Sequence, residues 1–253
     1  MSQAIVYGML RVKNEARWIE RVIKSIKPIC DKVFVFDDHS TDGTPDICEN
    51  LGARVHRSQF TGLDESRDKN LLLSWIYQEV PPQFSKANFA SPYWALAIDG
   101  DEVLAEGHGE IIRDSITVGI KHVYALRVAY LWDNESTVRV DGVYANFRRP
   151  SLFRLFNDTF RYQKTPWGNG ANFHCSNIPQ ELLHHSTPCD AVLLHYGYML
   201  KEDRLKKFEF YNRVDPNNAG EDQYRHMVIG DVSELPATAK TKWAGPLSLL
   251  RIS

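Results

Sequence analysis

The chain has 253 residues, of which 43% are hydrophobic, enough for one α/β domain with a full core. Its 30 basic and 32 acidic residues nearly cancel, so no overall field attracts nucleic acid and we expect no nucleic-acid partner. The four cysteines (Cys30, Cys48, Cys175 and Cys189) are widely spaced, which is typical of reduced thiols in a cytoplasmic protein.

Membrane insertion is not expected, because no apolar run approaches the about 18 residues that a spanning helix needs. We therefore expect a soluble, cytoplasmic protein. A peripheral membrane contact stays open through a few apolar residues near the C-terminus: Trp243, Leu247, Leu249 and Leu250.

Strand and helix patterns alternate through the first hundred residues. Thr44 is expected to cap one helix, with Pro45 in its first turn and Gly52 after its end. Short apolar runs predict strands at 4–10, 33–36, 54–56 and 93–98, and helical spacing predicts helices over 18–26, from Thr44, and from near Glu65. This alternation predicts a mostly parallel sheet with its ligand at the carboxyl ends of the strands.

The second half has a different pattern. Extended segments are predicted over 122–132, 138–147 and 151–156. A short strand, Ala191–Leu194, ends at His195, and Lys201–Val214 has the pattern of a charged helix that carries aromatic residues. We expect mixed sheet in this half. No linker divides the chain, so one domain over residues 1–253 is predicted.

Three motifs occur in order where predicted strands end. The first is Arg11–Glu15, the second is Val35–Thr44 with its pair Asp37-Asp38, and the third is Ile98–Glu102 with the sequence Asp-Gly-Asp. Together they resemble family 2 glycosyltransferases, and the resemblance covers residues 1–105. It implies a GT-A fold, which is a Rossmann-like α/β domain with a mostly parallel sheet. The implied halves are a nucleotide-sugar-binding part, 1–104, and a mixed-sheet acceptor part, 105–253.

The resemblance implies a transferase that takes a sugar from a nucleotide-diphosphate donor and inverts the anomeric centre. A sugar nucleotide presents a diphosphate whose negative charge grows as the glycosidic bond breaks, so a divalent cation with oxygen ligands stabilises the leaving group. Asp99 and Asp101 supply such ligands, and Gly100 between them leaves room for ribose and diphosphate. The expected metal is manganese or magnesium.

The nucleotide is expected to bind at the other two motifs and at a downstream helix. By resemblance, Asp38 accepts a hydrogen bond from the base, most simply from uracil. The predicted nucleotide-binding residues are Arg11, Lys13, Asn14, Glu15, Asp38, Arg67, Asn70, Asp99 and Gly100. Among them, Arg67 and Asn70 resemble the family's arginine–asparagine element, in which a guanidinium pairs with diphosphate oxygens.

His195 resembles the late histidine that completes the metal site in many GT-A enzymes, so it is predicted as the third metal ligand after Asp99 and Asp101. The alternative for His195 is a core histidine packed under the neighbouring tyrosines.

The proton-accepting base for transfer has three candidates: Asp141, Glu181 and His174. Related sequences often carry a His-Glu pair, whereas His174 is followed here by Cys175. A retaining mechanism stays open, because sequence fixes neither the attacking face nor the acceptor pose. Trp167 is the predicted acceptor-binding residue, since it lies in a loop and aromatic rings stack on sugars. The acceptor itself, whether glycan, lipid-linked or protein, is not indicated.

Two other functions fit the sequence less well. A sugar nucleotidyltransferase would need a glycine-rich phosphate loop after its first strand, and Arg11–Arg17 contains no glycine. A catalytically inactive GT-A module that serves as a scaffold is disfavoured, because Asp99 and Asp101 are both present.

Overall fold

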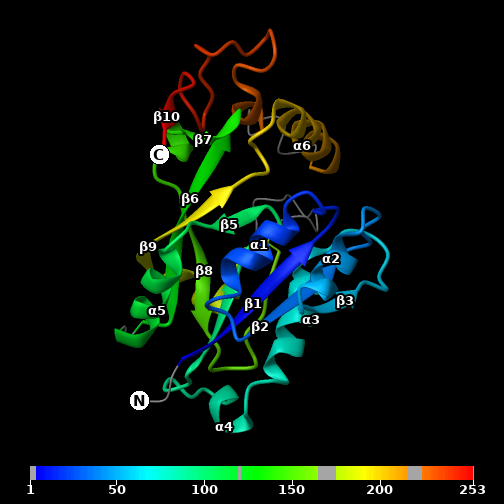
Figure 1. The fold of residues 1–253 in the computed structure, drawn as a ribbon, viewed down its shortest axis with the longest axis vertical. Helices are drawn as coiled ribbons and strands as arrows, with labels where there is room; N and C mark the ends of the chain where they lie inside the picture. The colour runs from blue at the N-terminus through cyan, green and yellow to red at the C-terminus, as the bar shows by residue number, and fades with distance from the viewer. Residues whose placement is uncertain (1–3, 119–120, 165–174, 216–223, 253) are drawn as a thin grey trace.

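The computed structural model describes residues 4–118, 121–164, 175–215 and 224–252. Within them, the strands form a ten-stranded sheet with the order β10-β7-β6-β8-β4-β1-β2-β3, and β9 joins it beside β6 and carries β5 (Figure 1). The predicted α/β fold class is confirmed. The same sheet runs through both predicted halves of the chain.

The first half of the sheet is parallel. Its strands are β1 (Ile5–Val12), β2 (Lys32–Asp37), β3 (Arg54–Arg57) and β4 (Tyr93–Ala97), and β1 pairs with β2 and β4. Val6 and Leu10 pack in one core cluster with α1 (Ile19–Ile26), while Met9 packs in another with α3 (Glu65–Tyr77). Alternate side chains of a strand point to opposite faces, so helices on both faces account for the apolar runs.

The second half is mixed, as predicted. β8 (Arg148–Arg154) is antiparallel to β4 and to β6 (Val123–Trp132), whereas β9 (Ser186–His195) is parallel to β6. The remaining strands are β5 (Glu102–Leu104), β7 (Asn134–Arg139) and β10 (Leu249–Arg251). Other described elements are α2 (Thr44–Asn50), α4 (Pro82–Ser85), α5 (His108–Val118), η1 (Gly142–Tyr144) and η3 (Gln180–His185).

Two local predictions were wrong. Residues 138–147 do not form one extended segment, because β7 ends at Arg139 and η1 begins at Gly142. Thr44 is the first residue of α2 rather than its cap, and the capping residue is Gly43 with a left-handed φ of 83°. The Thr44 hydroxyl instead donates to Asp42 and accepts the backbone N–H of Glu15. It thereby ties the Arg11–Glu15 motif to the start of α2.

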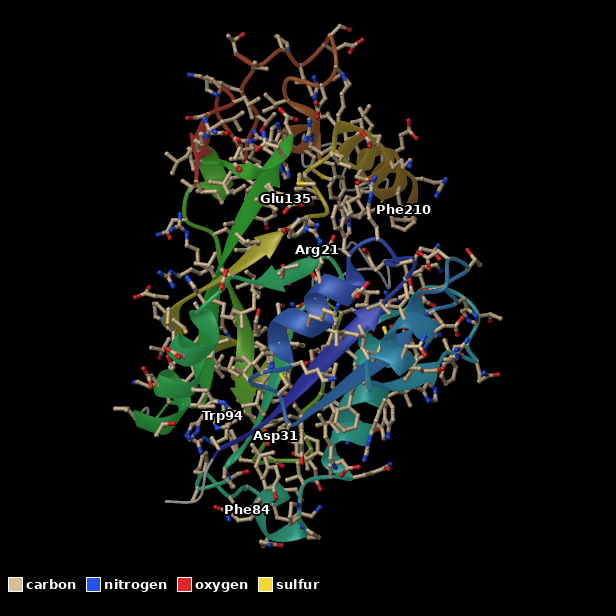
Figure 2. The ribbon with its side chains drawn as sticks, viewed as in Figure 1. Arg21, Asp31, Phe84, Trp94, Glu135 and Phe210 are labelled. Carbon is tan, nitrogen blue, oxygen red and sulfur yellow. The ribbon has the colours of Figure 1, made fainter. Side chains whose placement is uncertain are left out.

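Helix α6 (Lys201–Val214) packs in a separate small cluster with η4 (Arg225–Val228). Arg204 anchors it: the buried guanidinium donates to Asp231, to Asp133 and to the backbone carbonyls of Tyr198 and Met199. Figure 1 shows α6 beyond the arrowhead of β1. Phe210, labelled in Figure 2, lies on this helix. Arg21 of α1 and Glu135 of β7, also labelled there, form an ion pair, with 2.8 Å between Nη1 and Oε1.

Candidate functional site

A pocket of about 710 Å³ lies where β1 and β4 end, and α6 forms part of its wall. It gathers most of the predicted nucleotide and metal residues: Arg11, Lys13, Asn14, Glu15, Asp99, Gly100, Asp101 and His195. A larger hollow of about 850 Å³ between α1 and α5 is lined by none of the predicted site residues. We refer to the first as the donor pocket.

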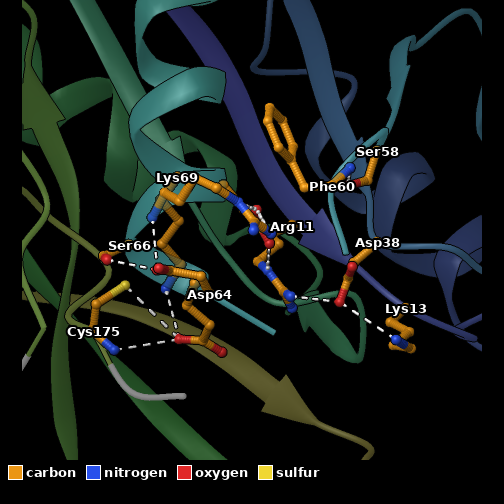
Figure 3. Close-up of polar contacts among 12 residues, drawn as sticks. Arg11, Lys13, Asp38, Ser58, Phe60, Asp64, Ser66, Lys69 and Cys175 are labelled. Atoms are coloured by element: carbon orange, nitrogen blue, oxygen red, sulfur yellow. Dashed lines mark hydrogen bonds and ion pairs between the residues drawn. The ribbon is translucent and has the colours of Figure 1, made fainter. Parts of the chain in front are cut away.

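Arg11 is held at the pocket wall by two buried carboxylates (Figure 3). Its NH2 donates to Asp38 Oδ2 at 2.7 Å and its Nε donates to Asp68 Oδ2 at 3.0 Å. Asp68 also accepts hydrogen bonds from the guanidinium of Arg67, which lies over the ring of Phe60. Asp38 therefore orients Arg11 in this structure, and Lys13 Nζ lies 3.5 Å from the same Asp38 oxygen.

The acidic loop after β4 is fixed by Arg149 on β8. The Arg149 guanidinium donates to Asp99 Oδ2 at 2.9 Å and also to Glu102 Oε2, which accepts the backbone N–H of Asp99. Burial alone would raise the pKa of Asp99, but the guanidinium of Arg149 and the ammonium of Lys69 act together against it and lower that pKa. A side chain at position 100 would lie 2.8 Å from Glu15 Cγ, so glycine lets this loop pack on the Arg11–Glu15 turn.

Asp101 lies between β9 and α6. Its Oδ2 accepts a hydrogen bond from Lys207 Nζ at 2.7 Å and lies 3.8 Å from His195 Nε2. The strand register explains this proximity, because Glu102 of β5 pairs with His195 of β9. A Cβ at position 197 would lie 2.0 Å from Asp101 Oδ2 and 2.2 Å from Lys207 Nζ. Gly197 therefore gives Lys207 access to Asp101.

The electrostatics of the pocket follow from burial. Burial lowers the pKa of His195 to about 4, so its imidazole is neutral at pH 7 and can act as a metal ligand. Burial and the nearby Asp101 raise the pKa of Glu15 to about 9. Burial opposes ionisation of Asp101 as well, but Lys207, with smaller contributions from His195 and Arg149, keeps the pKa of Asp101 below its usual range.

The predicted metal ligands line one pocket and fit a divalent ion by chemical type. Asp99, Asp101 and His195 offer two carboxylates and an imidazole, a set that suits manganese or magnesium. Asp101 already binds a cation, the ammonium of Lys207. Among the described residues, however, no three His, Cys, Asp or Glu side chains are arranged as a ready metal site. The metal site stays a prediction.

Other predicted residues lie away from the donor pocket. Asn70 makes two hydrogen bonds to the backbone of Tyr162. Asp141 is buried against Arg139 and accepts the N–H of Ser248, and Glu181 is exposed and accepts the N–H of Arg161. Their positions indicate structural roles. His174 and Trp167 lie outside the described residues.

Sequence reasoning missed several residues of the pocket. Arg149 and Lys207 reach the two acidic ligands from β8 and α6. The basic, aromatic pattern of 201–214 was the available signal for Lys207, together with Lys206, Phe210 and Tyr211, which also line the pocket. No local pattern marked Arg149.

Comparison with known proteins agrees with the motifs. The model for Glycosyl transferase family 2 matches residues 10–71. An uncharacterized glycosyltransferase of Rickettsia felis is 29% identical over 168 residues, which are 66% of this chain and 50% of the relative. One of Rickettsia typhi is 33% identical over 209 residues, which are 79% of this chain and 63% of the relative. The resemblance to family 2 glycosyltransferases is confirmed.

The chain spans about half the length of the first of these relatives. Among solved structures, S. aureus TarS aligns with a TM-score of 0.48 and 12% identity, over 94% of this chain and 75% of that one. Glucosyl-3-phosphoglycerate synthase from Mycobacterium tuberculosis, in complex with Mn2+ and UDP-Glc, aligns with a TM-score of 0.34 and 20% identity. That alignment covers 50% of this chain and 44% of the synthase.

Proposed function

We propose that this chain transfers a sugar from a nucleotide-diphosphate donor, with UDP as the expected nucleotide, to an acceptor hydroxyl, and that a divalent metal assists. One observation carries the proposal: the donor pocket brings the Arg11–Glu15 turn together with Asp99, Asp101 and His195. These groups come from three separate strand ends, and the sequence motifs had assigned them to one site.

The basic side chains of the pocket would bind the nucleotide, and the acidic side chains with His195 would bind the metal. Arg11, held by Asp38 and Asp68, directs a fixed guanidinium toward the nucleotide, and Lys13 adds a second cation at the rim. Asp99, Asp101 and His195 would hold the metal, which when bound would neutralise charge on the departing diphosphate. Lys207 would release Asp101 and pair with a phosphate oxygen instead, because an ammonium binds either anion.

The attacking hydroxyl needs a base, and the positions of Asp141 and Glu181 do not support that role. The first is neutralised by Arg139 beneath η1, and the second lies on the exposed side of η3. The inverting outcome rests on the family resemblance alone. Within the described residues, no helix has the length and apolar character to cross a membrane.

The test is a donor screen. UDP- and GDP-sugars are incubated with the protein in manganese, in magnesium and in EDTA, and free nucleotide is measured. We expect metal-dependent release from one nucleotide class, and loss of at least about 100-fold in Asp101→Asn, by analogy with the removal of one electrostatic stabiliser. Absence of both nucleotide binding and release would favour the inactive scaffold. Equal release in EDTA and manganese would overturn the role of the metal.

A further inference from the structure

A second, smaller cavity of about 290 Å³ opens from the donor pocket. The two share Glu65, Asp99, His195 and Tyr211. The other residues that line the smaller cavity come from α3, β6, β8, η3 with the segment before it, and the segment after β9, and include Lys69, Tyr130, Arg149, Asn177, Leu183 and Tyr198. We call it the inner chamber. Its shared wall contains the expected metal ligands Asp99 and His195, so a group attached to a bound diphosphate can enter it.

Two buried polar atoms on the chamber walls lack partners. Arg149 uses NH1 and NH2 on Asp99 and Glu102, but its buried Nε has no hydrogen-bond partner among the described residues. His195 is 8% exposed, and its Nδ1 is likewise unpaired within the described part of the chain. A buried polar group without a partner is costly and rare in folded proteins, so these two atoms point to a ligand with hydroxyl groups.

The charges of the chamber are compensated internally. Lys69 lies 3.7 Å from Glu65 and donates to Asn177 Oδ1, and Arg149 is paired with both Asp99 and Glu102. Among the described residues that line the chamber, no basic side chain is left unpaired for an anionic ligand. Tyr130 adds a hydroxyl for which no hydrogen bond is found among the described residues, and its ring packs against those of His195 and Tyr198. A neutral, hydroxyl-bearing ligand matches this lining.

The size of the chamber sets the size of the ligand. At about 30 Å³ for each water in the liquid, 290 Å³ corresponds to roughly ten waters. That volume suits one sugar ring and excludes an extended acceptor.

We propose that the inner chamber binds the sugar ring of the donor and selects a neutral hexose over the corresponding uronic acid. This inference rests on the proposed transferase function. Hydroxyls of the ring would pair with Arg149 Nε, with His195 Nδ1 and with the Tyr130 hydroxyl. The extra carboxylate of a uronic acid would face the carboxylate of Glu65, while Lys69 and Arg149, the two basic side chains that line the chamber, are already paired with Glu65 and Asp99.

The test uses a matched pair of donors in calorimetry with manganese present: UDP-glucose and UDP-glucuronic acid. If guanosine is the nucleotide that binds, the pair is GDP-mannose and GDP-mannuronic acid. We expect the neutral donor to bind at least about tenfold more tightly. Equal affinity, or preference for the acid, would overturn the selection. Failure of the bare nucleotide to bind would instead overturn the proposed function.

Two variants locate the sugar. Leu183→Trp fills the chamber from η3, so the neutral donor should bind at least about tenfold more weakly while the bare nucleotide changes less than about twofold. Val118→Trp is the matched control, since Val118 on α5 is 84% exposed, and it should change neither the affinity for the neutral donor nor that for the bare nucleotide. Tyr130→Phe should weaken only the neutral donor, by about three- to tenfold. If Leu183→Trp and Tyr130→Phe are both folded by thermal melts and both bind the neutral donor as tightly as the parent, the sugar binds outside the chamber.

Discussion

Replacement of Lys207 by methionine tests whether the ion pair between Lys207 and Asp101 stabilises the fold. Lys207 Nζ lies 2.7 Å from Asp101 Oδ2, and the two side chains are 28% and 6% exposed. Loss of one partner of a buried ion pair costs about 3–5 kcal/mol, because the other charge stays buried and unpaired. The partial exposure of Lys207 favours the lower end, about 3 kcal/mol. For a chain of this size that corresponds to a fall in Tm of about 6–12 °C in EDTA.

Manganese should reverse much of this loss. With the ammonium removed, Asp101 can bind the ion without competition, so Lys207→Met should gain more Tm from manganese than the parent does. Lys206→Met is the control, since Lys206 is exposed and makes no ion pair among the described residues. A Tm in EDTA equal to that of the parent, or an equal manganese response in both proteins, would refute the competition between Lys207 and the metal.

The same pair predicts a dependence on pH. Lys207 lowers the pKa of Asp101, so the pair stabilises the fold above the ordinary aspartate pKa of about 4 and is lost only as the pH falls through the lowered value. The Tm difference between parent and Lys207→Met should therefore be full at pH 7 and shrink in acid. A difference that grows below about pH 4 would contradict this sign.

Three further predictions concern the site and its support. Asp38→Ala removes the acceptor that holds Arg11 at 2.7 Å and should weaken nucleotide binding by about 1–3 kcal/mol in calorimetry; unchanged affinity would remove Asp38 from the site. Arg204→Met leaves buried Asp231 unpaired beneath α6 and should destabilise the fold by about 3–5 kcal/mol in denaturant unfolding, so a change under about 1 kcal/mol would refute the anchoring role. Because the folded state raises the pKa of Glu15 to about 9, the parent loses stability as the pH rises from about 4 to about 9. The Tm of Glu15→Gln should therefore be higher than that of the parent at pH 8 and equal to it at pH 4. If the two proteins have the same Tm at both pH values, the carboxyl of Glu15 is ionised in the folded protein at pH 8.

The sequence by itself determined the alternating first half. Apolar runs such as Ile5–Leu10 and Val33–Phe36 could only be strands buried on both faces, and the polar motifs follow them directly. Parallel strands end at one edge of the sheet, so the Arg11–Glu15 turn and the Asp99–Asp101 loop were predicted to meet, and they line one pocket. His195 was predicted from its resemblance to the family's late histidine, and it lies at the end of β9 in the same pocket.

Only the tertiary structure decided what surrounds those motifs. Lys207 and Asp101 are separated by 106 residues, and Arg149 and Asp99 by 50, so no local period or spacing links the partners. Asn70 fitted a family element in sequence, yet its amide bonds to the backbone of Tyr162, 92 residues away. Side-chain partners of this kind depend on how distant strands and helices pack, and that packing is set by burial over the whole chain rather than by any short segment.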